Sequence, residues 1–325
     1  MPQNKPIRRV AVIGTGVIGA SWAALFLANG LEVVATDVAP DAEAALKRFV
    51  AAAWPALQRL GLASGASQSR LSFTAPLATA VKNADLVQEN GPEKIDFKRT
   101  LYKQLDELLP PDVIIASSSS GLTMSEIQSA CASHPERCVI GHPFNPPHLV
   151  PLVEIVGGAR TSEDTIQRAT EFYAGLGKRP VRLNKEVPGH VANRLQAALA
   201  REVYHLVAEG VVSVADVDTA LSWGPGLRWG IMGQVLLNHL GGGQGGIEHF
   251  FQQFTGPMEA WWKVLGNPHL TPDVQRKLID GVHAEIGSRS VDELAAERDE
   301  ILLGLIELRK KVAKADQPKL EEPVA

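Results

Sequence analysis

The sequence predicts an α/β fold in which a doubly wound, mostly parallel sheet is followed by an all-helical C-terminal domain. Three observations predict it. Short apolar runs alternate with stretches of helical periodicity through the first half of the chain. A glycine-rich turn joins the first apolar run to the first helix. After Val187 strand-like runs cease and helical periodicity continues, so we expect domains at residues 1–187 and 188–325.

The first predicted unit is a strand, a turn and a helix. Residues 9–13 are largely β-branched, which favours a strand. The glycines of segment 14–19 end it, and the Ala- and Leu-rich residues 20–28 favour a helix that Gly30 closes. A second apolar run, residues 31–36, ends at Asp37 and is the next expected strand.

The remaining elements continue this alternation. A helical stretch follows Asp37 to about residue 60. Apolar runs predict strands at 71–73, 84–88, 113–116, 138–142, 152–156 and 180–183. Helices are expected at 95–108, from a capping box at 123–126, and at 162–176. Beyond His190 the periodicity predicts helices at 191–209, from residue 213 and at 290–311, with the glycine-rich segment 241–246 as a connection between helices.

The glycine turn has the context of a dinucleotide site. Gly14, Gly16 and Gly19 follow a strand and open a helix, and Asp37 stands 23 positions after Gly14. Such glycines permit a tight turn and let backbone amides approach a pyrophosphate, so Val17 and Ile18 belong to the expected site. An aspartate here accepts hydrogen bonds from ribose hydroxyls, and no arginine follows it to hold a 2′-phosphate. These features predict a Rossmann-type domain that binds NAD.

A histidine and a glutamate form the second candidate constellation. His142 ends one apolar run, and Glu154 lies twelve residues later in the next. Pro146 and Pro147 between them cannot continue a helix, so the chain turns there. If the two runs are neighbouring strands, the carboxylate can reach the ring, and a histidine so held is a candidate general base. The alternative is a satisfied histidine beside an ordinary strand glutamate.

Several polar segments fall at predicted strand ends, where ligands of open α/β sheets gather. They are the glycine loop, Asp37, the segment from Glu89 through Asn90 to Glu93, the serines 117–120, and His142. Their common position favours the functional interpretation of the histidine.

Composition favours a soluble enzyme. The chain has 325 residues, 45% hydrophobic and 21% charged, with a formal net charge of −4. The sequence lacks the excess of basic residues that is typical of a nucleic-acid-binding surface. No apolar run approaches the length of about eighteen residues that predicts a membrane span. Cys131 and Cys138 cannot form a disulfide framework and lack metal-ligand spacing, so we expect no metal and a reducing, cytoplasmic setting.

On these motifs the chain resembles the 3-hydroxyacyl-CoA dehydrogenase family over about residues 7–260. The resemblance implies an NAD-dependent dehydrogenase with His142 as general base and Glu154 as its orienting partner. It implies that Ser120, with Ser119 as a rival, bonds the substrate hydroxyl. Asn193 would hold the substrate oxygen. The cofactor cleft would be lined by Glu93, Lys98 and Asn145.

Two segments bear on the substrate. Residues 225–230 resemble the branch of the family that oxidises small free 3-hydroxy acids, and segment 41–70 has few basic residues to recognise CoA. Arg228 could clamp a carboxylate or brace the loop that also carries Trp229. An aromatic set could include a cage for a trimethylammonium group, or belong to core or interface: Phe144, Trp223, Trp229, Phe250, Phe251, Phe254, Trp261 and Trp262. L-Carnitine, oxidised to 3-dehydrocarnitine, is the first substrate expected and L-gulonate the second.

Three other functions are compatible with parts of the pattern. They are a short-chain L-3-hydroxyacyl-CoA dehydrogenase, a catalytically silent NAD-binding structural protein, and a lysine-dependent β-hydroxyacid dehydrogenase. The last needs a lysine where this chain has Asn193 and Arg194. The helical half carries more apolar surface than a small domain can bury alone, and the family resemblance implies pairing with a copy, so we expect a homodimer.

Overall fold

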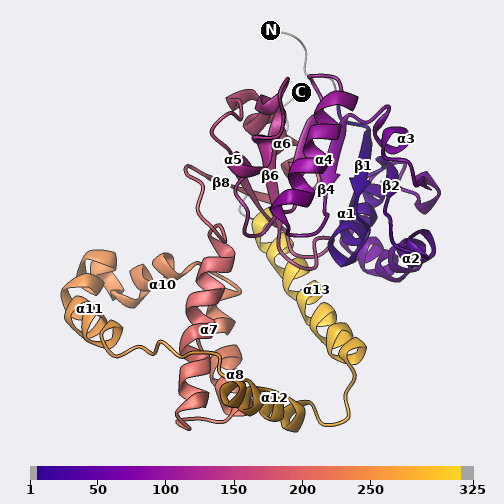
Figure 1. The fold of residues 1–325 in the computed structure, drawn as a ribbon. Helices are drawn as coiled ribbons and strands as arrows, with labels where there is room; N and C mark the ends of the chain where they lie inside the picture. Colours follow the sequence, from indigo (N-terminus) through magenta and orange to yellow (C-terminus); the bar gives the residue numbers. More distant parts are fainter. Residues whose placement is uncertain (1–5, 316–325) are drawn as a thin grey trace, which may run out of the picture. The chain divides into compact units, whose positions relative to one another are not determined.

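The structure, a computed structural model, describes residues 6–315. The chain forms two compact units that divide between Arg194 and Leu195. The first is an α/β unit, and every regular element in the described part of the second is a helix (Figure 1). The predicted fold class is confirmed.

The first unit contains one eight-stranded sheet, in the order β3-β2-β1-β4-β5-β6-β7-β8. Its strands are β1 Arg9–Ile13, β2 Glu32–Thr36, β3 Leu71–Phe73, β4 Leu86–Glu89, β5 Ile114–Ser117, β6 Cys138–Pro143, β7 Leu152–Gly157 and β8 Arg179–Leu183. All neighbours are parallel except β6 and β7, which are antiparallel. Strand order reverses beside β1, so the ends of β1 and β4 form the switch point where such sheets bind ligands.

The helices of this unit connect successive strands. They are α1 Val17–Ala28, α2 Ala42–Leu60, α3 Leu77–Val81, α4 Ile95–Leu108, α5 Met124–Gln128 and α6 Glu163–Gly175, with short 3-10 turns η1 Gln68–Arg70 and η2 Pro135–Arg137. The predicted capping box of Thr123 and Glu126 is confirmed at the start of α5. Helix α1 begins at Val17 rather than at the predicted Ala20, because the third glycine of the motif is itself a helical residue.

Both faces of the sheet are covered by helices. Along β1, Val10 and Val12 belong to one hydrophobic cluster, while Ala11 and Ile13 belong to another. The first cluster includes α1, α2 and α6, and the second includes α3, α4 and α5. Burial on both faces explains why β1, β5, β6 and β7 are largely apolar in sequence.

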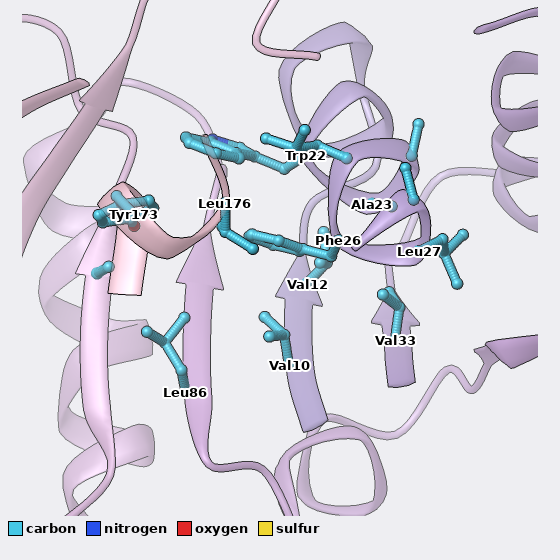
Figure 2. Close-up of a cluster of buried hydrophobic side chains, with 14 of the residues drawn as sticks. Val10, Val12, Trp22, Ala23, Phe26, Leu27, Val33, Leu86, Tyr173 and Leu176 are labelled. Carbon is cyan, nitrogen blue, oxygen red and sulfur yellow. The ribbon is translucent and has the colours of Figure 1, made fainter. Parts of the chain in front are cut away.

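Aromatic side chains form the centre of the first cluster. Figure 2 shows Trp22 and Phe26 of α1 close to strand residues that include Val12, with Tyr173 beside them. The ring centroids of Trp22 and Phe26 lie 5.4 Å apart, and those of Trp22 and Tyr173 lie 5.3 Å apart. The Tyr173 hydroxyl donates to Gln88 Oε1 at 2.5 Å, which satisfies a polar group inside this core.

The second unit is built from helices that bury little apolar surface by themselves. They are α7 Ala192–Ala208, which begins in the first unit, α8 Val214–Trp223, α9 Pro225–Trp229, α10 Gln234–Gly241, η3 Gly243–Gly245, α11 Gly246–Trp262, α12 Pro272–Ile286 and α13 Val291–Ala315. Its buried cluster consists of Val207, Val214 and Val217. Among residues 6–315, no helix combines the length and apolar character needed to cross a membrane.

The start of α7 is bonded to the first unit. The backbone amides of Val191 and Ala192 donate to Glu154 at 2.8 and 3.0 Å, and the His190 ring donates to the Ser119 carbonyl at 3.0 Å. These bonds attach the start of α7 to the sheet, so residues up to Arg194 belong to the first unit.

Candidate active site

The turn after β1 has the geometry that a dinucleotide diphosphate needs. Gly14 has φ +80°, and a Cβ on Gly19 would lie 1.8 Å from the Gly14 carbonyl oxygen, whereas a Cβ on Gly16 would meet nothing within 4 Å. The first and third glycines therefore permit close packing of strand and helix, and the second leaves space for a ligand at the backbone. No side chain caps α1 and its first turn has no acidic residue, so its amides suit a diphosphate.

Asp37 follows β2 at the same edge. Thr15 donates to its carboxylate from the backbone amide at 2.6 Å and from the hydroxyl at 3.0 Å, and Ala39 donates at 2.9 Å. Burial raises the pKa of Asp37, but these hydrogen bonds outweigh burial and hold the pKa below its ordinary value. The carboxylate is thus charged at neutral pH and can accept bonds from ribose hydroxyls.

The four consecutive serines have different surroundings. Three hydroxyls donate to side chains of the β4 end: Ser117 to Glu89 at 2.6 Å, Ser118 to Asn90 at 2.8 Å and Ser119 to Glu93 at 2.6 Å. Among the residues that the structure describes, none accepts a hydrogen bond from the Ser120 hydroxyl. Ser120 is exposed and Ser119 is 1% exposed. This arrangement favours Ser120 as the serine that meets a ligand.

Glu93 holds the serine turn in place. One of its oxygens accepts hydrogen bonds from the backbone amides of Ser120, Gly121 and Leu122 at 3.0, 2.7 and 3.0 Å. Burial raises the pKa of Glu93, but the Ser119 hydroxyl and the backbone amides lower it to a net value below the ordinary one. The carboxylate therefore stays charged and keeps the turn folded around it.

Lys98 is occupied by a buried ion pair. Its ammonium, 1% exposed, lies 2.9 Å from both oxygens of Glu89. A lone buried carboxylate would be costly, so this pairing stabilises the end of β4 beneath the serine turn. A cofactor contact of Lys98 stays a prediction.

His142 and Glu154 meet as the sequence predicts. The antiparallel register of β6 and β7 sets them directly opposite, and His142 Nδ1 lies 2.8 Å from Glu154 Oε2. Both are buried, at 4% and 1% exposure. An ionised carboxylate can only accept, so Nδ1 carries the proton and Nε2 of the neutral ring has a free lone pair.

The second oxygen of Glu154 holds the start of α7. It accepts the amides of Val191 and Ala192. Burial raises the pKa of Glu154, but the hydrogen bonds from His142, Ala192 and Val191 outweigh it and leave the pKa below its ordinary value. A charged carboxylate at a helix N-terminus also interacts favourably with the helix dipole.

His190 belongs to the site, although its sequence context gave little reason to select it. Its ring centroid lies 5.0 Å from that of His142, and its Nε2 donates to the Ser119 carbonyl at 3.0 Å. The residue is 2% exposed and has φ +49°. Burial lowers the pKa of His190, the Ser119 bond opposes this, and the net pKa is below the ordinary value. The neighbouring Gly189 is the only sequence signal, since it predicts a turn there.

The other expected residues of the first unit are placed around this centre in different ways. Asn145 is exposed and Phe144 half-buried in the turn after β6, where the peptide bond before Pro146 is cis. Buried Lys178 donates to the carbonyl oxygens of Pro147 and Val150 and so anchors that turn. Asn193 is half-buried at the start of α7, in the same compact unit as His142.

The expected substrate residues of the second unit lie at its surface. Arg228 and Trp229 are exposed on α9, and the Trp229 indole donates to Gln234. The ring pairs in the described part of this unit join Phe250 to its neighbours Phe251 and Phe254. Among the described residues of this unit, no ring pair includes a tryptophan. Residues 6–315 also contain no cluster of His, Cys, Asp or Glu suited to a metal ion.

Comparisons of sequence agree with the geometry. Residues 9–187 match the family described as 3-hydroxyacyl-CoA dehydrogenase, NAD binding domain, and residues 189–298 match 3-hydroxyacyl-CoA dehydrogenase, C-terminal domain. An L-carnitine dehydrogenase of a Pseudomonas species is 48% identical over 307 residues, covering 94% of this chain and 95% of the relative. A protein of the same name from Streptomyces coelicolor is 49% identical, covering 92% and 93%.

Solved structures show the same likeness. The structure of 5-formyl-3-hydroxy-2-methylpyridine 4-carboxylic acid 5-dehydrogenase, described as an NAD+-dependent dismutase, has a TM-score of 0.81 and 32% identity, covering 93% of this chain and 98% of that chain. That of 3-hydroxybutyryl-CoA dehydrogenase from Escherichia coli has a TM-score of 0.65 and 26% identity, covering 85% and 57%.

Proposed function

Because this chain belongs to the 3-hydroxyacyl-CoA dehydrogenase family and is an NAD-dependent oxidoreductase acting on a CH–OH group, we propose that its substrate is L-carnitine, oxidised to 3-dehydrocarnitine. One observation carries this choice. Relatives named L-carnitine dehydrogenase, from Pseudomonas, Streptomyces coelicolor and Bacillus cereus, are 44% to 49% identical over more than nine-tenths of the chain. L-Gulonate is the second candidate.

In the proposed mechanism His142 is the general base. Its Nδ1–H is held by Glu154, so the lone pair of Nε2 takes the proton of the substrate 3-hydroxyl. Bound NAD supplies the hydride acceptor. The charged Glu154 stabilises the imidazolium that forms. The hydroxyl of Ser120 and the amide of Asn193 hold the substrate oxygen.

The cofactor contacts follow the edge of the sheet. We assign the diphosphate to the turn of Gly14, Gly16, Val17, Ile18 and Gly19, and the ribose hydroxyls to Asp37. Asn90, Glu93, Lys98, Ser120 and Asn145 would line the remainder of the cofactor site. The open space at the second glycine and the uncapped α1 support the diphosphate assignment.

Domain assignment and assembly are parts of the same proposal. Residues 1–187 bind NAD, and residues 188–325 supply substrate contacts and a homodimer interface. The helical unit supports an interface because Trp223, Trp261 and Trp262 are 79%, 59% and 62% exposed. A largely apolar hollow of about 460 Å³ is lined by residues of α7, α8 and α12 in the same unit. A monomer by light scattering at micromolar concentration would contradict the dimer.

The substrate residues and the cellular setting are proposed from chemistry. Arg228 would bind the substrate carboxylate, and Phe144 and Trp229 would contact the trimethylammonium group. The protein would act in the cytoplasm, with small molecules as its partners and without nucleic acid or membrane.

A turnover panel tests the substrate. NADH formation is measured with L-carnitine, L-gulonate, 3-hydroxybutyrate and L-3-hydroxybutyryl-CoA, and kcat/KM is expected to be highest for L-carnitine. 3-Hydroxybutyrate has the same acid and hydroxyl but no ammonium, so equal turnover of it would refute recognition of that group. A higher kcat/KM for the thioester would refute the free-acid assignment.

The base is tested separately. His142→Asn should lower kcat by at least about a hundredfold with little change in NAD affinity, the scale of a lost acid–base group. His134→Asn is the matched control, because His134 also pairs with a glutamate, Glu136, but at the surface. A His142→Asn enzyme with near-normal kcat would rule out the mechanism.

A further inference from the structure

We propose that His190 is a positioning residue for the oxidation step: it fixes Ser120 beside the base and stays neutral, so that His142 alone takes the substrate proton. This rests on the functions proposed above for His142 and Ser120. Two contacts define it, the bond from His190 to the serine turn and the packing of its ring against His142.

The bond from His190 completes a clamp on one peptide group. The carbonyl of the peptide between Ser119 and Ser120 accepts from His190 Nε2 at 3.0 Å, and its amide donates to Glu93 at 3.0 Å. With both polar atoms held, that peptide plane cannot rotate freely. The Cα of Ser120 is therefore fixed, while its hydroxyl keeps its bonding capacity for a ligand.

The surroundings of His190 favour one protonation state. A carbonyl oxygen can only accept, so Nε2 carries the proton and Nδ1 is unprotonated in the neutral ring. Nδ1 is buried and has no hydrogen-bond partner among the described residues. Protonation would create a buried donor without an acceptor, next to a base that becomes cationic during the reaction.

The charged groups around His190 come from several elements. His142 on β6 opposes its protonation, whereas Glu154 on β7 and Glu93 after β4 favour it. Burial is the largest effect and disfavours the cation, so the pKa of His190 lies below its ordinary value. At neutral pH the ring consequently acts as a fixed donor.

The backbone at His190 is also unusual. Gly189 and His190 both have positive φ, +78° and +49°, and a positive φ is uncommon for a residue with a Cβ. Strained conformations of this kind persist where surrounding contacts hold them, often at functional sites. Here the bond to Ser119 and the bonds that follow at Val191 and Ala192 hold the turn.

Three substitutions at His190 distinguish the effect of its Nε2–H donor from the effects of ring packing and of backbone conformation. His190→Phe keeps an aromatic ring and removes both nitrogens. His190→Gln places an amide NH₂ near the position of Nε2 and cannot titrate. His190→Asn tolerates positive φ but its shorter side chain cannot reach the Ser119 carbonyl.

We expect His190→Phe and His190→Asn to lower kcat by about tenfold, the scale of one lost hydrogen bond, with KM for NAD unchanged. His190→Gln should restore kcat to near the wild-type value. Its low-pH limb of kcat should match the wild type, because His190 does not titrate with the base. The primary deuterium isotope effect with C3-deuterated substrate should rise in His190→Phe as the chemical step slows.

Three results would overturn the proposal. They are a His190→Phe enzyme with wild-type kcat, equal losses in the Phe and Gln variants when all retain the wild-type Tm, and a shifted low-pH limb in His190→Gln. Failure of the underlying mechanism has a different signature. In that case His142→Asn itself stays active, whatever the His190 variants do.

Discussion

Glu154→Gln is the most informative single change at the candidate site. Glu154 joins the base on β6 to the first amides of α7 by three hydrogen bonds at 2.8, 2.8 and 3.0 Å. A glutamine has the same shape but only one acceptor oxygen. If that oxygen faces the α7 amides, its NH₂ confronts the Nδ1–H of His142, and two donors then oppose each other.

The expected fall in kcat follows from the loss of the hydrogen bond between His142 and Glu154. A hydrogen bond to a charged group contributes roughly 1.5–3 kcal/mol, which corresponds to about ten- to a hundredfold in rate when the bond stabilises the forming imidazolium. The pKa of Glu154 is lowered in the fold, despite the opposing effect of burial, by bonds from His142 and the α7 amides. The carboxylate is therefore ionised throughout the neutral range, so Glu154 itself does not titrate there.

The assay is NADH formation at saturating substrate, with NAD affinity measured by titration of protein fluorescence. Glu154→Gln should lower kcat by about ten- to a hundredfold and leave NAD affinity unchanged, since the glycine turn is a separate part of the edge. Glu163→Gln provides the matched control, because Glu163 pairs with Arg182 on the surface. The control should keep the wild-type kcat.

One result would refute the reasoning about Glu154. If Glu154→Gln kept the kcat of the Glu163→Gln control, the carboxylate would neither orient the base nor stabilise its cation. If Glu154→Gln lowers both kcat and Tm strongly, kcat is measured again with refolded enzyme that is saturated with NAD. If activity then returned, the carboxylate would serve the fold and not the chemistry.

Three further predictions concern cofactor choice and stability. Asp37→Ser should weaken NAD binding and relax the preference over NADP, measured as the ratio of kcat/KM values; an unchanged ratio would contradict the ribose contact. Tyr173→Phe should cost about 1–3 kcal/mol in urea unfolding, because it leaves a buried acceptor of Gln88 without its donor. Burial raises the pKa of Asp106, but bonds from Ser133, His134 and Arg137 bring it below its ordinary value. The ionised Asp106 carboxylate therefore stabilises the fold fully above about pH 4, and this stabilisation is lost as pH falls through the lowered pKa. In Asp106→Asn the free energy of unfolding should depend less on pH in that range.

Much of the fold could be predicted because local sequence and tertiary environment agree. Strands buried on both faces are apolar runs, and the turn glycines mark where strand and helix pack closely. The sequence does not predict the short helix α3, since five residues are too few to show a helical period. Helix α11 contains Pro257, which in sequence argues against a helix of 17 residues.

Part of the candidate site could likewise be predicted from the sequence, and part could not. The pairing of His142 with Glu154 depends on two adjacent strands and one turn, and spacing along the chain predicts it. The contact of His190 with Ser119 joins residues 71 positions apart and depends on a positive φ. A single sequence shows neither a contact between residues so far apart nor the backbone angle of one residue. The structure adds support to the prediction of Ser120 over Ser119, because the Ser119 hydroxyl donates to Glu93.

The carboxylates at this edge are held mainly by neutral donors. Asp37, Glu93 and Glu154 accept backbone amides together with a hydroxyl or an imidazole, whereas Glu89 has the buried Lys98 as its partner. Amides keep a carboxylate ionised without cancelling its charge. Glu154 therefore keeps its negative charge beside His142, the proposed base, which becomes cationic when it takes a proton. A cationic side chain in place of the Val191 and Ala192 amides would repel the protonated ring, so backbone ligation of Glu154 supports the role proposed for His142 as a base.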